Sequence, residues 1–145
     1  MLVRIISHLT LLCVQIDLSN NQLCGINICG DGTYTTEGIQ AVASAISVSA
    51  SLTSIDLSYN HLRPEGAKHI AKGIAVSASL TDINLSDNIL TNYGQDVSGV
   101  QAIADALRFS ASLIAADLRR NCLDADTKQE LRNAMNDRPS FELNL

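Results

Sequence analysis

The sequence has no tryptophan, and aromatic residues make up only 3% of its 145 positions. It also has no run of lysine and arginine, and its net charge is −5. Nucleic-acid binding needs a basic face, so this charge balance disfavours it. The missing basic run disfavours binding to anionic membranes, and no apolar stretch is long enough to span a bilayer.

Motifs of common catalytic sites are missing as well. The sequence contains no G-x-S-x-G nucleophile motif and no G-x-x-x-x-G-K-[ST] phosphate loop. Its three histidines, His8, His61 and His69, are scattered along the chain. The Asp-Gly pair at residues 31–32 lacks the final glutamate of a calcium loop. We therefore expect a protein that is not an enzyme and that needs no cofactor or metal.

The sequence does contain a repeated segment with the pattern L-x-x-L-x-L-x-x-N-x-L. Copies begin at Leu52, Leu80 and Leu113, and an earlier one begins at Cys13. Their spacings of about 39, 28 and 33 residues indicate a unit of about 28 residues with two insertions. A shorter copy closes the chain at residues 141–145. The pattern predicts strands near residues 13–18, 52–57, 80–85, 113–118 and 141–145.

Helices are predicted between the strands, because apolar residues there recur at positions i, i+3, i+4 and i+7. A fourth helix is expected at about Ala125 to Met135. Lys128 and Arg132 occupy its inner positions, so we expect it to be a terminal cap. The apolar stripes of the other three are Ile39, Val42, Ala43 and Ile46; Ala67, Ile70, Ala71 and Ile74; and Val100, Ile103, Ala104 and Leu107.

An asparagine recurs where each predicted strand ends. Its side-chain amide can bond the backbone of the neighbouring turn and so satisfy polar groups that no strand ladder reaches. We therefore expect these residues to be structural and not part of a binding site. They are Asn21, Asn60, Asn88 and Asn121.

The repeat unit resembles the ribonuclease-inhibitor type of leucine-rich repeat, which also occurs in NOD-like receptors and Ran GTPase-activating proteins. The resemblance runs from about Leu9 to Leu145. It rests on the strand motif, on the helix opening at residues 65–67 and on the lead into the next strand at residues 77–81. It implies an α/β solenoid: a short right-handed β-α superhelix with a concave parallel sheet and helices on the convex side. Residues 1–145 would form a single domain of about four units plus a closing strand.

Such a scaffold carries many binding functions. We expect a non-catalytic protein–protein interaction module that uses its concave face and its strand-to-helix loops. One alternative is a regulatory role of the Ran GTPase-activating type, although neither Arg119 nor Arg120 matches a catalytic motif. A second alternative is a self-assembling chain, or a fragment of a longer solenoid, that pairs through an exposed sheet edge as a homodimer.

Candidate binding residues on the concave face form columns, because alternate strand residues point outward. The acids among them could receive lysine or arginine from a basic partner, or they could be surface residues repeated by duplication. The first column is Gln15, Ser54, Asp82, Ala115 and Glu142. The second is Asp17, Asp56, Asn84, Asp117 and Asn144. The third is Ser19, Ser58, Ser86 and Arg119.

The two insertions are further candidates. One follows Leu23 and runs through about Tyr34, and the other follows Leu90 and covers about Thr91 to Asp96. Loop tyrosines make good interface anchors because they are large and have few rotatable bonds. Alternatively, a solenoid tolerates such insertions at little cost. The candidate protein-binding residues are Asp17, Ser54, Asp56, Asp82, Asn84, Asp117 and Arg119 on the strands, and Asp31, Tyr34, Tyr59, Tyr93 and Asp96 in the loops.

The N-terminal segment Met1–Leu12 is apolar but has no small-residue cleavage site. We favour a truncated repeat helix with Leu2, Ile5, Ile6 and Leu9 on one face over a signal peptide, and hence a cytoplasmic protein. In a reducing compartment the four cysteines would be free thiols. Cys13 is expected to be a small buried apolar residue, and Cys122 is expected to pack near the next layer. Cys24 and Cys29 could instead form a disulfide or half of a metal site.

Overall fold

The computed structural model describes residues 14–27 and 29–145, and within them the chain forms five strands and four helices. The strands are β1 (Val14–Asp17), β2 (Leu52–Asp56), β3 (Asp82–Asn84), β4 (Ala115–Asp117) and β5 (Glu142–Asn144). The helices are α2 (Glu37–Val48), α3 (Arg63–Val76), α4 (Ser98–Phe109) and α5 (Ala125–Ala134). Each strand lies within the residue range that the repeat predicts for it. The expectations for Met1–Leu12 and for Cys13 fall outside the described residues.

All five strands form one parallel sheet in chain order, β1-β2-β3-β4-β5. The register confirms the first two predicted columns, because a constant step from unit to unit places equivalent residues side by side. One row runs through Gln15, Ser54, Asp82, Ala115 and Glu142. The next row runs through Asp17, Asp56, Asn84, Asp117 and Asn144.

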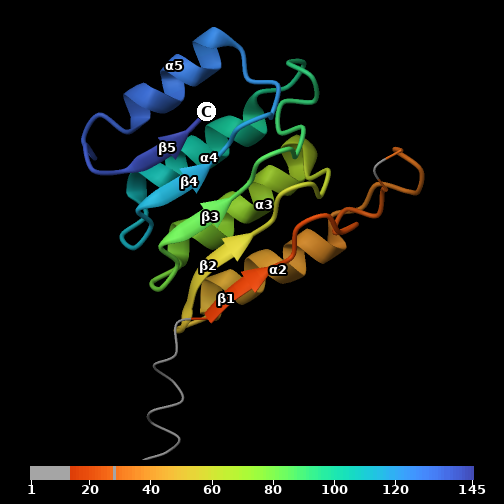
Figure 1. Ribbon diagram of the computed structural model, residues 1–145, viewed down its shortest axis with the longest axis horizontal. Coiled ribbons are helices and arrows are strands. Elements are labelled where there is room, and N and C mark those ends of the chain that lie inside the picture. The colour runs from red at the N-terminus through yellow and green to blue at the C-terminus, as the bar shows by residue number, and fades with distance from the viewer. Residues whose placement is uncertain (1–13, 28) are drawn as a thin grey trace, which may run out of the picture.

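The molecule has two layers, because every strand-to-strand connection after β1 carries its helix on the same side of the sheet (Figure 1). Helices α2, α3 and α4 lie side by side behind the strands, and α5 lies at the β5 end. No described element covers the opposite face of the sheet, which we call the open face. All-parallel sheets usually have both faces covered, so this open face is the feature that positions the candidate site.

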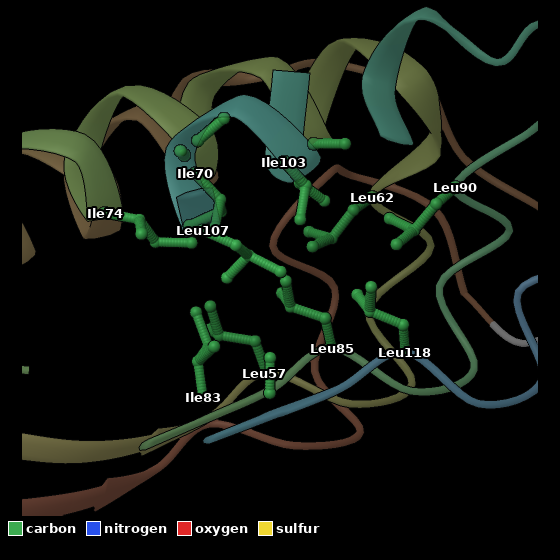
Figure 2. Packing of buried hydrophobic residues seen from close by; sticks show 14 of the residues in the cluster. Leu57, Leu62, Ile70, Ile74, Ile83, Leu85, Leu90, Ile103, Leu107 and Leu118 are labelled. Atoms are coloured by element: carbon green, nitrogen blue, oxygen red, sulfur yellow. The ribbon is translucent and has the colours of Figure 1, made fainter. Parts of the chain in front are cut away.

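The core lies between the sheet and the helices (Figure 2). Leu57, Leu85 and Leu118 follow the strands and point toward Ile103 and Leu107 on α4 and toward the apolar side of α3. Burying each such side chain contributes about 1.5–3 kcal/mol. The predicted helix stripes are buried with two exceptions, Val42 and Ala104, which are only partly covered.

Small residues allow the helices to approach closely. A Cβ on Gly73 of α3 would lie 2.7 Å from the carbonyl oxygen of Ala43 on α2. A Cβ on Gly99 of α4 would lie 2.6 Å from the Cα of Pro64 at the start of α3. Neither backbone atom can move aside cheaply, so both glycines are needed for this packing.

The last helix begins at Ala125 as predicted and ends one residue earlier than expected, at Ala134. Asp124 caps it, because its carboxylate accepts a hydrogen bond from the backbone N–H of Thr127 at 2.8 Å. That bond lowers the pKa of Asp124. After the helix, the Arg138 guanidinium donates to the carbonyl oxygens of Leu107 and Leu113, which ties the closing segment to the end of α4.

In the part of the chain that the structure describes, every helix is too short or too polar to cross a membrane.

Candidate functional site

The second row on the open face has a structural role that sequence reasoning missed. In each of four units its Asp or Asn side chain accepts a hydrogen bond from the backbone N–H two residues later, where the strand ends. Such local bonds favour a turn over a continued strand. The recurrence of Asp and Asn therefore follows from the turn. The bonds are Ser19 to Asp17 at 2.9 Å, Ser58 to Asp56 at 2.8 Å, Ser86 to Asn84 at 3.0 Å and Arg119 to Asp117 at 3.0 Å.

The carboxylates of this row are largely satisfied within the molecule. Asp56 also accepts from the Ser58 hydroxyl at 2.7 Å and from the Asn84 amide at 2.8 Å. Asp117 forms an ion pair with Arg119 at 2.6 Å. Burial acts to raise the pKa of Asp117, but hydrogen bonds from Arg119 hold it below its usual value. The row therefore offers little unpaired negative charge to a basic partner.

The first row forms the middle of the open face. Gln15 and Glu142 are exposed at its ends, and the three residues between them are half-buried. A shallow hollow of about 210 Å³ lies over β2, β3 and β4 and is lined in part by Ser54, Asp82 and Ala115. The Asp82 carboxylate accepts from the Thr81 hydroxyl at 2.5 Å. Small and polar side chains thus leave this part of the face accessible.

The rim beyond the strand ends brings together aromatic and charged side chains. Arg120 donates to the Tyr59 hydroxyl at 3.1 Å and lies 3.7 Å from the Asp87 carboxylate. With Arg119 they line a hollow of about 190 Å³. Sequence reasoning named Tyr59 and Arg119 as binding candidates but not Asp87 or Arg120. Only the contacts between units reveal that these residues share one surface.

The recurring asparagines hold the turns, as predicted. Asn60, Asn88 and Asn121 are buried, and their amides donate to backbone carbonyls of their own unit and of the unit before it. Asn121 Oδ1 accepts from Asn88 N–H, and Asn88 Oδ1 accepts from Asn60 N–H. Asn60 Oδ1 is buried without a partner among the described residues. Asn21 is exposed, and its side-chain bonds to the described residues are all local.

The first insertion is held against α3 by Tyr34. The Tyr34 hydroxyl donates to the carbonyl oxygen of Leu62 at 2.6 Å and accepts from Gly66 N–H at 3.2 Å. The Arg63 guanidinium lies over the ring, 5.2 Å from its centroid. Burial is the main cause that raises the pKa of Tyr34 to about 12. This tyrosine therefore anchors the loop to its own protein, and its hydroxyl is not free for a partner.

Replacing Tyr34 with phenylalanine should lower the free energy of unfolding by about 1–2 kcal/mol, because two hydrogen bonds are lost and the Leu62 carbonyl loses a donor. Urea unfolding measures the loss. The matched control is Tyr93→Phe in the second insertion, whose ring is exposed. Equal effects of the two substitutions would show that the Tyr34 contacts do not hold the loop.

The acids of the insertions also have local roles. Asp31 accepts from the Asn27 amide at 3.2 Å within the first insertion. Asp96 accepts from Ser98 N–H at 2.9 Å at the start of α4. Hydrogen bonding at Ser98 lowers the pKa of Asp96. Of the three loop tyrosines, Tyr93 is the most exposed.

The three described cysteines differ in their exposure. Cys24 and Cys29 are both free thiols, so they form no disulfide in this structure. Cys24 is buried, and burial raises the pKa of its thiol to about 11. Cys122, which was expected to pack near the next layer, is exposed. It follows Asn121 with a left-handed backbone (φ 58°), and its side chain lies at the surface.

Iodoacetamide should therefore label Cys29 and Cys122 in the folded protein and leave Cys24 unmodified. The reactive form is the thiolate, and a buried thiol with a raised pKa stays protonated near neutral pH. Mass spectrometry of peptides from labelled protein measures each site, and labelling in urea is the control that all three can react. Rapid native labelling of Cys24 would contradict its burial.

The histidines do not come together in the described structure. His61 lies in the turn after β2, and His69 Nε2 on α3 lies 3.2 Å from the Gln40 amide. Among residues 14–27 and 29–145, no three His, Cys, Asp or Glu side chains lie close enough to hold a metal ion.

No protein-family model matches the sequence, and no curated protein matches it either. A solved structure described as "Leiomodin-1 Actin-Binding Site 2 (ABS2)" has a similar fold, with a TM-score of 0.69. The two chains are 17% identical, and the match covers 90% of this chain and 68% of the other. At this identity the likeness establishes an α/β fold in common and nothing more specific.

Proposed function

We propose that this chain is a leucine-rich-repeat module of the ribonuclease-inhibitor type that binds a protein partner on its open face and catalyses no reaction. The observation that carries the proposal is the five-stranded parallel sheet with helices on one face only. Such a sheet usually has both faces covered. A partner protein would supply the missing cover.

The repeat assignment is supported by the way each unit is built. A short strand leads into a turn with a structural asparagine, and a helix then returns along the back of the sheet. Each unit cannot bury its apolar face alone, which is the physical basis of repeat architectures. The concave curvature of the sheet and the right-handed superhelix are part of this proposal.

The chemistry of the face favours a partner that is recognised by shape and hydrogen bonds rather than by charge alone. The carboxylates of the second row are engaged by their own turns, and the hollow over β2–β4 is shallow and lined by both polar and apolar side chains. Aromatic and arginine side chains often anchor protein interfaces. Tyr59 and Arg120 on the rim are the residues of those types that we assign to the interface.

The likeness to a leiomodin structure described as an actin-binding site supports protein binding as the class of function. It also makes actin a reasonable first protein to test. Purified actin filaments can be sedimented with the protein, and the amount that co-sediments measures binding. Failure to bind actin would exclude that partner only.

Replacing Ala115 with arginine should abolish capture of the partner, because a long side chain would fill the hollow on the open face. The matched control is Ala45→Arg on the exposed side of α2. Affinity capture from cell extract, followed by quantitative mass spectrometry, compares both variants with the unchanged protein. Circular dichroism checks that both variants remain folded.

The proposal requires at least one protein that the unchanged chain and Ala45→Arg enrich and that Ala115→Arg does not. If the two variants capture the same proteins, the open face is not the binding surface. If none is enriched by any form, protein binding is itself contradicted under those conditions.

The alternatives stay predictions. For GTPase activation of the Ran type, no residue of this chain is assigned a catalytic role, and Arg119 is paired with Asp117. Pairing through a sheet edge would use β1 or β5, the two outer strands. No described contact favours either reading over partner binding on the open face.

A further inference from the structure

The helix layer exposes a row of apolar side chains that the open face does not explain. The last residue of each of three neighbouring helices is large and apolar: Val48 on α2, Val76 on α3 and Phe109 on α4. These side chains are 83%, 64% and 72% exposed. Soluble monomers rarely expose contiguous apolar patches larger than roughly a few hundred Å², and patches above that size often mark interaction sites.

Phe109 lies at one end of a groove between α3 and α4 with a volume of about 530 Å³. The apolar side chains that line this groove besides Phe109 are all alanines. They are Ala71 and Ala75 on α3 and Ala102 and Ala106 on α4. The groove can therefore receive a side chain that neither helix supplies.

The two walls of the groove carry opposite charges. Lys72 lies on the α3 wall and Asp105 on the α4 wall. Neither forms an ion pair within the described residues. The other cation of the α3 wall, Lys68, is paired with Glu65 at 2.6 Å. One cation and one anion thus remain for a partner, on opposite sides of an apolar floor.

We propose that this groove is the interface of a homodimer with two-fold symmetry. Phe109 of each copy enters the alanine-lined floor of the other, and Lys72 of each copy pairs with the partner's Asp105. A two-fold interface must be complementary to itself, because the same patch is used on both subunits. This groove meets that requirement, since it contains both a projecting ring and a floor for one, and both members of an ion pair.

A second copy explains these features together. A different protein would have to supply its own aromatic side chain to fill the alanine-lined groove, and it would also have to bury Phe109. The open face lies on the opposite side of the sheet and stays accessible in this dimer. The dimer therefore does not depend on the proposed function, and either proposal can fail alone.

Replacing Phe109 with serine should convert the dimer to a monomer, measured by sedimentation velocity over a concentration series from micromolar to millimolar. The matched control is Val48→Ser, which removes an even more exposed apolar side chain from the end of α2, outside this groove. It should leave the dimer intact. Both residues are exposed, so circular dichroism should show that both variants remain folded.

The charges provide a second test. Lys72→Asp alone, or Asp105→Lys alone, should weaken dimerisation at least tenfold because like charges then face each other. The double variant should recover the affinity of the unchanged chain, because the exchanged charges again pair across the two-fold axis. A chain that is monomeric throughout the series would overturn the proposal. So would a dimer that Phe109→Ser leaves intact, or a double variant that recovers nothing.

Discussion

Replacing Asn88 with alanine should lower the free energy of unfolding by roughly 2–6 kcal/mol, because two buried backbone N–H groups lose their acceptor. Those groups belong to Asn60 and Leu62, and both donate to Asn88 Oδ1. The carbonyl oxygens that accept from the Asn88 amide each have a second donor, which remains after the substitution. They therefore add less to the loss of stability. Leu57 O, for example, also accepts from the Asn60 amide.

The matched control is Asn21→Ala, at the same position of the first unit. Asn21 is exposed, and among the described residues its amide donates only to the carbonyl oxygens of Leu18 and Ser19, so its loss should cost less than about 1 kcal/mol. Urea unfolding compares the two variants. A small domain has only about 5–15 kcal/mol to lose, so the difference should be large. Equal losses would show that burial does not decide the role of this residue.

Replacing Leu85 with alanine should cost about 2–5 kcal/mol, because it removes a buried side chain and leaves a cavity. Leu85 lies between the sheet and the helices of the central units (Figure 2). Since neighbouring units support one another, the loss should lower the whole thermal transition and not the transition of one unit. Thermal unfolding followed by circular dichroism measures it.

Ile114→Ala is the control for Leu85→Ala, because Ile114 is a large apolar residue that is exposed just before β4. Its removal should change stability by no more than about 0.5 kcal/mol. If Leu85→Ala also lowers the free energy of unfolding by less than about 1 kcal/mol, the neighbouring side chains must move to fill the cavity. That would contradict the close packing of the two layers.

Sequence reasoning succeeded where a feature repeats with the unit. The strand register followed from the spacing of the copies, because equivalent residues of stacked units must lie side by side. The structural role of Asn60, Asn88 and Asn121 followed from their place at the strand ends. Both predictions use only periodicity and the need to satisfy buried polar groups.

The conformation of the turns could not be predicted in the same way. Tyr59, His61 and Ile89 all have a left-handed backbone, with φ between 52° and 56°. Such values are uncommon for residues other than glycine and most unusual for a β-branched one such as Ile89. Tertiary contacts impose them here, and no residue type in the sequence signals them.

The loop residues were hard to assign because their contacts are long-range. Tyr34 and Tyr93 occupy similar loops in the sequence, yet Tyr34 is held by Leu62 and Gly66 while the Tyr93 ring is exposed. In the sequence, Asp17 and Asp56 suggest an acidic surface. In the structure, each carboxylate accepts a hydrogen bond from the backbone N–H two residues later. That i to i+2 pattern in Asp-Leu-Ser was the available signal.

The chain of asparagine bonds has a direction, and this gives the molecule a weak and a strong end. Each Oδ1 reaches back to the preceding unit, but Asn60 Oδ1 finds no donor there among the described residues. The unit of β1 is therefore joined to the rest by fewer of these bonds than the units that follow it. When the protein is pulled from its two termini, the unit of β1 should unfold before the others. A single-molecule force trace would record this unfolding as an early, separate step.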